Sequence, residues 1–510
     1  MAELPPQAAP PSDTQQQPPL ASATPSDASP HVATAVPVKQ GWLARLAKNP
    51  ARDWVILFLA IQCLINIEGY TNAYSRWASL VAMVEDHSLR IDRYYHHTID
   101  WAYTPSGHFY SNKAPGPALL AYPLFWVMDR ALTHSTATRQ QRDRERVENR
   151  SMVLHVLSVA TQGIPYAVVV FLLISALQQL GFSVPALHLT ALALLFGNTA
   201  SLVMNNFFGH GVAATLVLAM LLALHRRRSG LVGLFFGLAV LSDYGAALLV
   251  LPLLGAMAWL RMLGSVRRLM YFVLGGLLPA AAFVAYHTRC FGSPFALPNK
   301  FQNPAFVDVS QSVPNLWGVL HLVPQRKVLF DLLFSPERGL LYTQPWVLLS
   351  IVLMPSLLWR RSGWAPLQRS FARWTCGFGL LALILLMVMN ACFGGWHGGA
   401  TPGPRYLAVG LPALALAMTG LFDRASELWR QALVVAVVFS LFLFLLLYST
   451  GEVLAQPENA LWPYYFQQLF SAPGKNLPRG LFIALGFGWA GWRAIRSIRK
   501  SASPAAVESR

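Results

Sequence analysis

Charged residues are scarce in this sequence. Only 12% of its 510 residues are Asp, Glu, Lys or Arg, whereas 55% are hydrophobic. In an ordinary soluble domain roughly a quarter of the residues are charged. This composition therefore excludes a soluble globular protein. Long apolar runs take the place of the charges, and runs of about 18 or more residues are typical of transmembrane helices. The runs are unbroken and do not alternate, which predicts a helical bundle and excludes a membrane β-barrel.

Acidic residues and cysteines are also few. The chain has 22 acidic and 39 basic residues, for a formal charge of +17. Such a charge can indicate nucleic-acid binding, but the bases form short clusters at the ends of apolar runs, as the positive-inside rule describes. We therefore expect no nucleic-acid partner. The four cysteines, at positions 63, 290, 376 and 392, show no metal or redox spacing.

The basic clusters predict the topology. Residues 1–40 are rich in Pro, Ala, Ser, Gln and Thr and are expected to be a disordered cytoplasmic tail. We expect a transmembrane domain over 41–500, with 501–510 as a second cytoplasmic tail. Basic clusters at 225–228, 360–373 and 493–500 are expected inside. The outer segments are then 71–114, 288–343, 394–405 and 450–477.

One conflict remains in this topology. The fold class is predicted as an all-α polytopic membrane protein with about 12–13 transmembrane helices. Thirteen crossings from a cytoplasmic N-terminus would end outside, yet the basic stretch 493–500 indicates the inside. The sequence locates the conflict in 115–180, where one apolar run does not cross completely.

The segment 72–122 carries most of the chemistry. Between Thr71 and Ala114 the chain has four acids, four bases, several histidines and a run of Tyr and Trp. Long connections in compact proteins are usually functional or disordered, and the aromatic content argues against disorder. Within it, residues 72–85 carry apolar side chains at helical spacing. We expect an amphipathic helix there, lying on the outer membrane surface.

The stretch TPSGHFYSNKAPGPALLAY, Thr104–Tyr122, resembles the GT-C glycosyltransferases, a superfamily that includes protein O-mannosyltransferases and the aminoarabinose transferases of lipid A. The likeness is a Gly-x-x-Tyr hairpin followed by a Lys-Ala-Pro turn that opens an apolar run. The fragments that support it are NNFFGHG at 205–211, RCFGSPF at 289–295, LFSPERGLLYTQP at 333–345 and GGWHGGATPGPRYL at 394–407. The chain is most similar to an uncharacterised bacterial branch, over roughly residues 50–450.

The resemblance implies a function. It implies a GT-C-like bundle in the bacterial inner membrane whose active face is periplasmic. There the protein would transfer a sugar from a polyprenyl-phosphate donor to a lipid, glycan or protein acceptor of the envelope. The alternative is a non-catalytic or transport protein that binds a lipid-linked glycan. A transporter would more often carry polar residues near mid-span, whereas here they cluster at the ends of the runs.

The general base is not carried over from the family. In the mannosyltransferase-like branches an Asp-Glu pair opens the outer loop, and here the corresponding residues, 72–76, contain no acid. A base must take the acceptor's proton, so we expect it among the nearest acids, Asp92, Asp100 and Glu68. Asp92 and Asp100 could instead pair with neighbouring arginines. Glu337 and Asp308, in other outer loops, are the alternatives.

Cations must stabilise the departing phosphate. The resemblance and the position at the water–lipid boundary favour Lys113 and Arg405, although many such residues only reach toward headgroups. His210, Arg338 and Arg76 are further candidates. From the same loop we expect Tyr103, His108, Tyr110 and Asn112 to contact substrate. The histidines and aspartates match no standard ligand template, so a divalent metal is not favoured. Asp243 either faces the bundle interior or caps a helix end.

Overall fold

The computed structural model describes residues 48–67, 70–134, 136–306, 315–316, 320–359, 364–399, 401–451 and 459–502. These residues belong to one structural unit, Leu46–Arg510. The described part is helical apart from two small β-hairpins. Among the described residues, four helices are long and apolar enough to cross a membrane, namely 150–179, 266–291, 366–391 and 427–450. The prediction of an all-α, multi-pass membrane protein is confirmed at this level. The number of crossings and the GT-C-like arrangement stay predictions.

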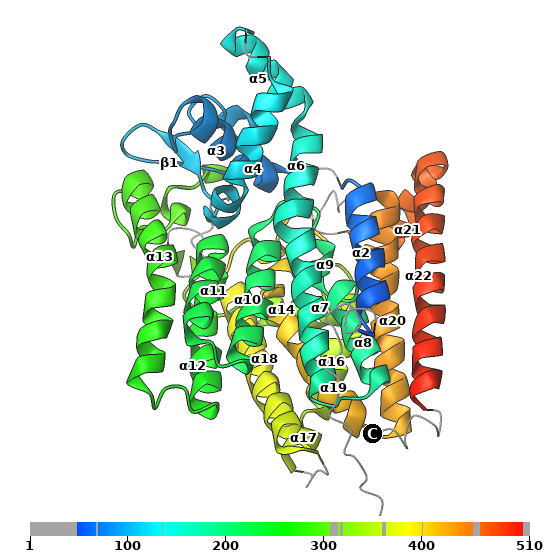
Figure 1. The fold of residues 1–510 in the computed structure, drawn as a ribbon. Coiled ribbons are helices and arrows are strands. Elements are labelled where there is room, and N and C mark those ends of the chain that lie inside the picture. Colours follow the sequence, from blue (N-terminus) through cyan, green and yellow to red (C-terminus); the bar gives the residue numbers. More distant parts are fainter. Residues whose placement is uncertain are drawn as a thin grey trace, which may run out of the picture. The chain divides into compact units, whose positions relative to one another are not determined.

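The N-terminal part of the unit contains the segment that is rich in chemistry. Its elements are α2 (Arg52–Leu64), α3 (Thr71–Glu85), η1 (Tyr95–His97), β1 (Trp101–Tyr103), β2 (Phe109–Ser111), α4 (Gly116–Leu132) and α5 (Arg139–Glu148). Figure 1 shows α3, α4, α5 and β1 gathered at one end of the long helices. The predicted site segment therefore forms a cap over that end of the bundle.

A long helix connects this cap to the bundle. It consists of α6 (Arg150–Ser158), one π-helical turn, η2 (Val159–Gly163), and α7 (Ile164–Gln179). The apolar helices that follow are α8 (Val184–Leu195), α9 (Thr199–Leu202), α10 (Gly209–His225), α11 (Ser229–Ser242), η3 (Tyr244–Leu249), α12 (Val250–Trp259) and α13 (Val266–Phe291). The starts and ends of these helices lie within a few residues of the apolar runs in the sequence.

The C-terminal part adds further helices. After η4 (Pro298–Phe301) and η5 (Pro304–Phe306), strand β3 (Asn315–Leu316) pairs with β4 (Leu320–His321). The remaining elements are α14 (Arg326–Phe334), α15 (Leu340–Thr343), α16 (Pro345–Leu353), α17 (Pro355–Trp359), α18 (Pro366–Ala391), η6 (Arg405–Leu407), α19 (Leu411–Arg424), α20 (Glu427–Thr450), α21 (Leu461–Ser471) and α22 (Pro473–Ser501).

Small residues allow the helices of the bundle to approach closely. A Cβ atom on Gly233 of α11 would lie 1.9 Å from the carbonyl oxygen of Phe272 on α13. Gly275 of α13 meets the carbonyl oxygen of Gly230 at the same distance. Helices in lipid associate largely through such close packing, because lipid tails provide no hydrophobic drive between them.

The predicted amphipathic helix forms as α3, but it does not lie on a surface. Its apolar positions Trp77, Leu80, Val81 and Val84 are buried, and so are its polar residues Asn72, Ser75, Arg76 and Ser79. Side chains of α4 and α6 pack against α3 in an apolar cluster separate from the main core. Other parts of the chain cover α3 on most sides. Its polar side chains therefore point into the protein, where they can contribute to a buried site.

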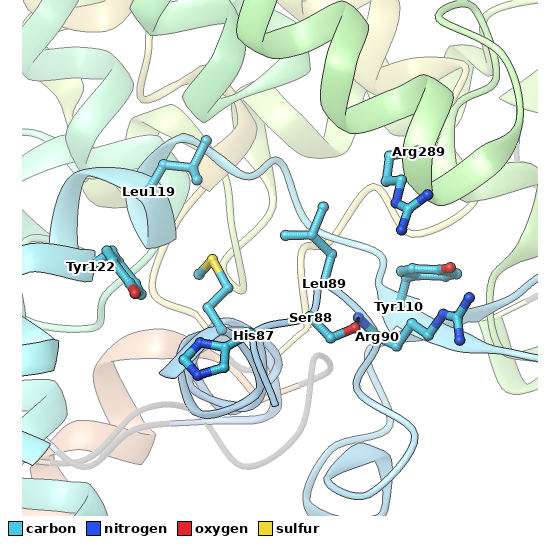
Figure 2. A pocket seen from close by; sticks show the side chains of 9 residues that line it. His87, Ser88, Leu89, Arg90, Tyr110, Leu119, Tyr122 and Arg289 are labelled. Carbon is cyan, nitrogen blue, oxygen red and sulfur yellow. Dashed lines mark hydrogen bonds between the residues drawn. The ribbon is translucent and has the colours of Figure 1, made fainter. Parts of the chain in front are cut away.

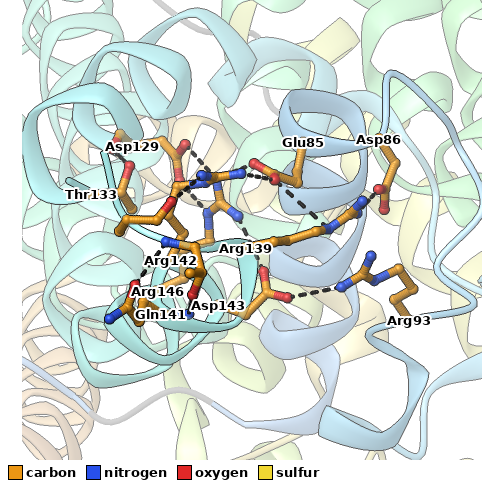
Figure 3. A network of polar contacts seen from close by, with 12 residues as sticks. Glu85, Asp86, Arg93, Asp129, Thr133, Arg139, Gln141, Arg142, Asp143 and Arg146 are labelled. Carbon is orange, nitrogen blue, oxygen red and sulfur yellow. Dashed lines mark hydrogen bonds and ion pairs between the residues drawn. The ribbon is translucent and has the colours of Figure 1, made fainter. Parts of the chain in front are cut away.

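An ionic network joins the ends of α3 and α4 to α5 (Figure 3). Arg146 of α5 binds both oxygens of Asp129 on α4, at 2.7 and 2.9 Å, and Glu85 of α3 at 2.8 Å. Arg142 also binds Glu85, at 2.6 Å. Burial alone would raise the pKa of Glu85, but these two guanidiniums lower it to about 2. The C-terminal ends of α3 and α4 are therefore fixed next to each other.

This network bears on the conflict in the topology. Helix α4 begins at Gly116, beside the site hairpin, and its other end is held to Glu85 through Asp129. Both ends of α4 therefore lie with α3 at the same end of the bundle (Figure 1). The expectation that one apolar run within 115–180 does not cross completely fits the run at 116–132 best, and the number of crossings stays a prediction.

Candidate functional site

A β-hairpin brings the first two site residues together. Strand β1 pairs with β2 so that Trp101 faces Ser111. Asp100 precedes this pairing and Lys113 follows it, and Lys113 Nζ lies 2.7 Å from Asp100 Oδ1. Asp100 is 7% exposed, so the ion pair is largely removed from water.

Helix α3 holds this hairpin in place through its polar face. The Ser75 hydroxyl donates to the backbone carbonyl of Asp100 at 2.5 Å and lies 2.6 Å from the hydroxyl of Ser111. Thr98 donates to the carbonyl of Thr71 at 2.6 Å. The buried serine of α3 thus contacts Asp100, just before β1, and Ser111 of β2, which fixes the position of the ion pair relative to the helix.

Burial dominates the electrostatics of the pair. It would raise the pKa of Asp100, but the Lys113 ammonium, with Arg405 nearby, brings that pKa below its usual value. Burial also lowers the pKa of Lys113, as do the positive charges of Arg405 and Arg76, against the effect of Asp100. Where cationic side chains outnumber the neighbouring carboxylates and are shielded from water, binding of an anion is favourable.

Arg76 extends the cationic centre from the same helix. Its Nη1 donates to the backbone carbonyl of Asn72 at 3.2 Å and to the Asn72 side chain. The residue is 5% exposed, and its Nε is buried with no hydrogen-bond partner among the described residues. Burial lowers its pKa to about 10, with Asp100 and Asp243 acting in the opposite direction. Arg76 is therefore charged at neutral pH.

A second acid–base pair faces Arg76. His210 Nδ1 lies 2.5 Å from Asp243 Oδ2, while the other oxygen of Asp243 accepts from the Gly245 amide at 2.9 Å. Gly209 makes this approach possible, because a Cβ there would lie 2.2 Å from the Ser242 carbonyl and 3.0 Å from Arg76 Nη2. Asp243 thus both caps η3 and orients the imidazole.

Arg405 completes the centre. It follows the Gly-Pro turn at 403–404 and lies over the rings of Phe208 and Tyr406, at 5.3 and 5.1 Å from their centroids. Its Nη2 donates to the Tyr406 hydroxyl at 3.3 Å, whereas its Nε is buried without a partner in the described part of the chain. Gly398, at φ +74°, leaves room for this side chain, because a Cβ there would lie 2.9 Å from Arg405 Nε.

We call these six residues the cationic centre: Arg76, Asp100, Lys113, His210, Asp243 and Arg405. They come from α3, the hairpin, the start of α10, the end of α11 and the turn before α19. Its three strong bases outnumber its two carboxylates. Such a centre can hold an anionic group by charge-assisted hydrogen bonds, and it also contains two groups able to accept a proton.

The other predicted acids lie elsewhere. Asp92 accepts from the Phe109 amide at 2.6 Å and pairs with His108 at 2.8 Å, so it orders the outer side of the hairpin together with a predicted substrate residue. Glu68 and Asp308 lie outside the described residues. The predicted catalytic roles of Asp92, Asp100 and Glu68 stay predictions, and the structure gathers only Asp100 into the cationic centre.

The remaining predicted residues lie around the centre. Arg338 is 1% exposed and donates to the backbone carbonyls of Glu337, His397 and Gly399, which orders the loop that carries Arg405. Asn112 lies beside Lys113, and its Oδ1 is buried with no partner among the described residues. Tyr110 packs edge-on against Phe291, whereas Tyr103 is 49% exposed.

Asp243, for which the sequence left open a place facing the bundle interior or a helix cap, was not among the predicted site residues, and in the structure it both pairs with His210 and caps η3. Its motif, Ser-Asp-Tyr-Gly, ends one apolar run, and the Gly-His-Gly motif of His210 begins another. These two polar motifs lie on the same predicted side of the membrane, at the ends of neighbouring apolar runs. That placement was the sequence signal that could have predicted their pairing. For metals, no group of three or more His, Cys, Asp or Glu side chains in the described ranges is arranged to hold an ion.

Figure 2 shows the residues that line a cavity of about 610 Å³ near the cationic centre. Its walls come from the end of α3, the loop after it, the hairpin, α4 and the end of α13. A narrow second pocket, lined by Lys113 and Arg76, shares Met83, Leu89 and Leu119 with it. The cavity therefore lies directly beside the pocket that Lys113 lines.

In comparisons with protein-family models, with curated proteins and with solved structures, nothing matches this chain.

Proposed function

We propose that this protein is a membrane glycosyltransferase of the GT-C type. It would transfer a sugar from a polyprenyl-phosphate donor to an envelope lipid, glycan or protein at the periplasmic face of a bacterial inner membrane. The observation that carries this proposal is the cationic centre, whose Arg76 and Asp100 are buried and whose other members are partly buried, at one end of a helical bundle with spans long enough for a membrane. The sequence resemblance to GT-C enzymes includes the Lys113 motif at its core.

The cationic centre suits a lipid-phosphate leaving group. In the proposed reaction the bond between the sugar's anomeric carbon and the phosphate oxygen breaks, and the phosphate keeps the electron pair. Lys113, Arg76 and Arg405 would stabilise the resulting negative charge. The unpartnered Nε atoms of the two arginines are donors that the described chain leaves available. Because the donor is already activated, the protein needs no nucleotide-binding domain.

The acceptor hydroxyl must lose a proton as its oxygen bonds to the sugar. Asp100 is the first candidate, because it is the one predicted acid in the cationic centre. Its proximity to Lys113 would also place it beside the departing phosphate. His210 is the second candidate. Asp243 holds its Nδ1, and its Nε2 has no hydrogen-bond partner among the described residues, which is the arrangement of an oriented imidazole base.

Donor cleavage tests this proposal. Purified protein would be incubated with a radiolabelled polyprenyl-phosphate sugar and extracted envelope material. We expect label to move to the extract and free polyprenyl phosphate to accumulate. The Lys113→Ala variant should be inactive while remaining inserted in the membrane. Movement of intact donor across a vesicle membrane without cleavage would instead support the transport alternative.

A further inference from the structure

The cavity beside the cationic centre has the chemistry of an anion site of its own. It is lined by two arginines, Arg90 and Arg289, and among its lining residues in the described chain none is acidic. Both arginines are exposed. Figure 2 shows their guanidiniums on either side of the Tyr110 ring. Two guanidiniums that line one cavity favour phosphate or carboxylate, each of which a guanidinium can bind with paired hydrogen bonds.

The turns at the ends of α3 and α13 fix the backbone positions of Arg90 and Arg289 on the two walls of the cavity. Helix α3 ends in a turn at His87, whose φ of 48° is uncommon for a residue with a side chain, and the Ser88 hydroxyl accepts from the Arg90 amide at 3.1 Å. On the other wall, α13 ends at Gly292 in the left-handed region, one turn beyond Arg289. Tyr110 and Phe291 pack together and join the two walls.

The same cavity also has apolar walls. Met83, Leu89 and Leu119 line it, and they are the residues it shares with the pocket of Lys113. Beyond the cavity, α4 and α13 expose large apolar side chains, including Leu120, Leu278 and Val284. Helix α13 is among the four that can cross a membrane and buries little of its surface in the protein. The cavity therefore lies between an exposed apolar surface of the helices and the pocket of the cationic centre.

We propose that this cavity is a second anion-binding site that takes the phosphate or carboxylate of an amphiphilic molecule. Calling that molecule the acceptor rests on the proposed function, and it makes the acceptor an anionic amphiphile whose hydroxyl reaches the Lys113 pocket past Leu119. The volume of about 610 Å³ lies within the range of roughly 300–1,000 Å³ for small-molecule sites. An uncharged acceptor would gain nothing from the two arginines.

Dodecyl phosphate is a suitable probe, because it combines an apolar chain with a phosphate. The full-length protein in an uncharged detergent would be titrated with it and the bound molecules counted by native mass spectrometry. We expect two molecules per chain, one at each site. The Arg90→Gln, Arg289→Gln double variant should bind only one, with at least a tenfold loss of affinity at the cavity. Lys113→Ala should lose the other molecule and keep the one in the cavity.

Controls separate the alternatives. Arg144→Gln removes the same charge from an exposed arginine of α5 at the same end of the bundle and should leave both molecules bound. Inorganic phosphate should bind the cavity at least tenfold more weakly than dodecyl phosphate, and equal binding would overturn the amphiphile part of the proposal. The anion site itself is contradicted if the double variant, folded as judged by its melting temperature, still binds two molecules. If Lys113→Ala still binds two molecules while the double variant binds one, the proposed donor site is contradicted and the anion site in the cavity is supported.

Discussion

The Lys113 ammonium can bind two different negative groups, the Asp100 carboxylate in the structure and a phosphate in the proposed reaction. In the structure its ammonium neutralises Asp100, and in the proposed reaction the same ammonium would face a phosphate. Charge-assisted hydrogen bonds of this kind contribute roughly 1.5–3 kcal/mol, which corresponds to about a tenfold to hundredfold change in affinity. Its side chain is 20% exposed, so water screens its charge less than that of a fully exposed lysine.

We therefore predict that Lys113→Ala and Arg405→Ala each weaken donor binding by about tenfold or more. Arg405→Lys should be nearly as harmful as Arg405→Ala, because a lysine cannot reproduce a two-point contact with phosphate. The measurement is the dissociation constant of a polyprenyl-phosphate sugar for each purified variant. Because Lys113→Ala strands a buried carboxylate, the double variant Lys113→Ala, Asp100→Asn serves as its folding control. Unchanged binding in both single variants would place the donor elsewhere.

The base is tested by two substitutions that each remove one proton-accepting group. Asp100→Asn and His210→Gln should both leave donor binding intact, and loss of the true base should lower turnover by roughly a hundredfold or more. A histidine base must be neutral to accept a proton, so with His210 as the base the turnover of the parent falls as pH drops through the imidazole pKa. With Asp100, whose pKa lies below its usual value, turnover stays level over the same range. Full activity in both variants would exclude the cationic centre as the source of the base.

At the scale of elements, the site depends on how α3, α4 and α5 are tied together. Arg146 is 5% exposed and Asp129 is 6% exposed. Removing one partner of a buried pair typically costs about 3–5 kcal/mol, because the other charge stays buried and unpaired. We predict that Arg146→Ala clearly lowers the melting temperature of the detergent-purified protein, whereas Arg144→Ala leaves it within a degree or two. Equal melting temperatures would show that the network is not structural.

The network also gives the protein a pH dependence. The pKa of Glu85 falls from 4.5 to about 2 on folding, so its stabilisation is complete above about pH 4.5 and is lost as pH falls toward 2. A shift of this size corresponds to roughly 3 kcal/mol. The melting temperature of the parent should fall more steeply between pH 5 and pH 3 than that of Glu85→Gln. Parallel curves for the two proteins would contradict this role of Glu85.

The helices and the start of α4 could be predicted from local sequence patterns. The pairing of distant residues and the burial of α3 could not, because they depend on tertiary contacts. Apolar runs and the Lys-Ala-Pro turn predicted the helices and the start of α4 closely. The pairing of His210 with Asp243 depends on the close approach of Gly209 to Ser242, which is a tertiary contact. The burial of α3 was missed for a related reason, since its apolar stripe fits a lipid surface and a protein core equally well.

At the scale of the whole molecule, the position of α4 bears on how many apolar runs cross the membrane, a number that stays a prediction. If the run at 116–132 is the one of about thirteen that does not cross, an even number remains, and both basic termini can lie on the same side. The GT-C-like topology is then consistent with the positive-inside pattern. The cationic centre and the cavity lie together at the opposite end from the clusters at 225–228 and 493–500.

Cysteine labelling tests this topology. In a variant without its four native cysteines, Ser106→Cys in the hairpin should react with an impermeant maleimide added to intact cells. Arg226→Cys, at the end of α10, should react only after the membrane is permeabilised. The reverse pattern would place the cationic centre on the cytoplasmic side and would remove the periplasmic reaction from the account.

The central claim is that the cationic centre holds a polyprenyl-phosphate donor while its sugar is transferred. The most direct measurement is the release of free polyprenyl phosphate from a radiolabelled donor by the purified full-length protein in the presence of envelope extract. The account predicts release that depends on protein, is matched by label in the extract, and is lost in Lys113→Ala but kept in Arg144→Gln. Release that is equal in the parent protein and in Lys113→Ala would contradict it.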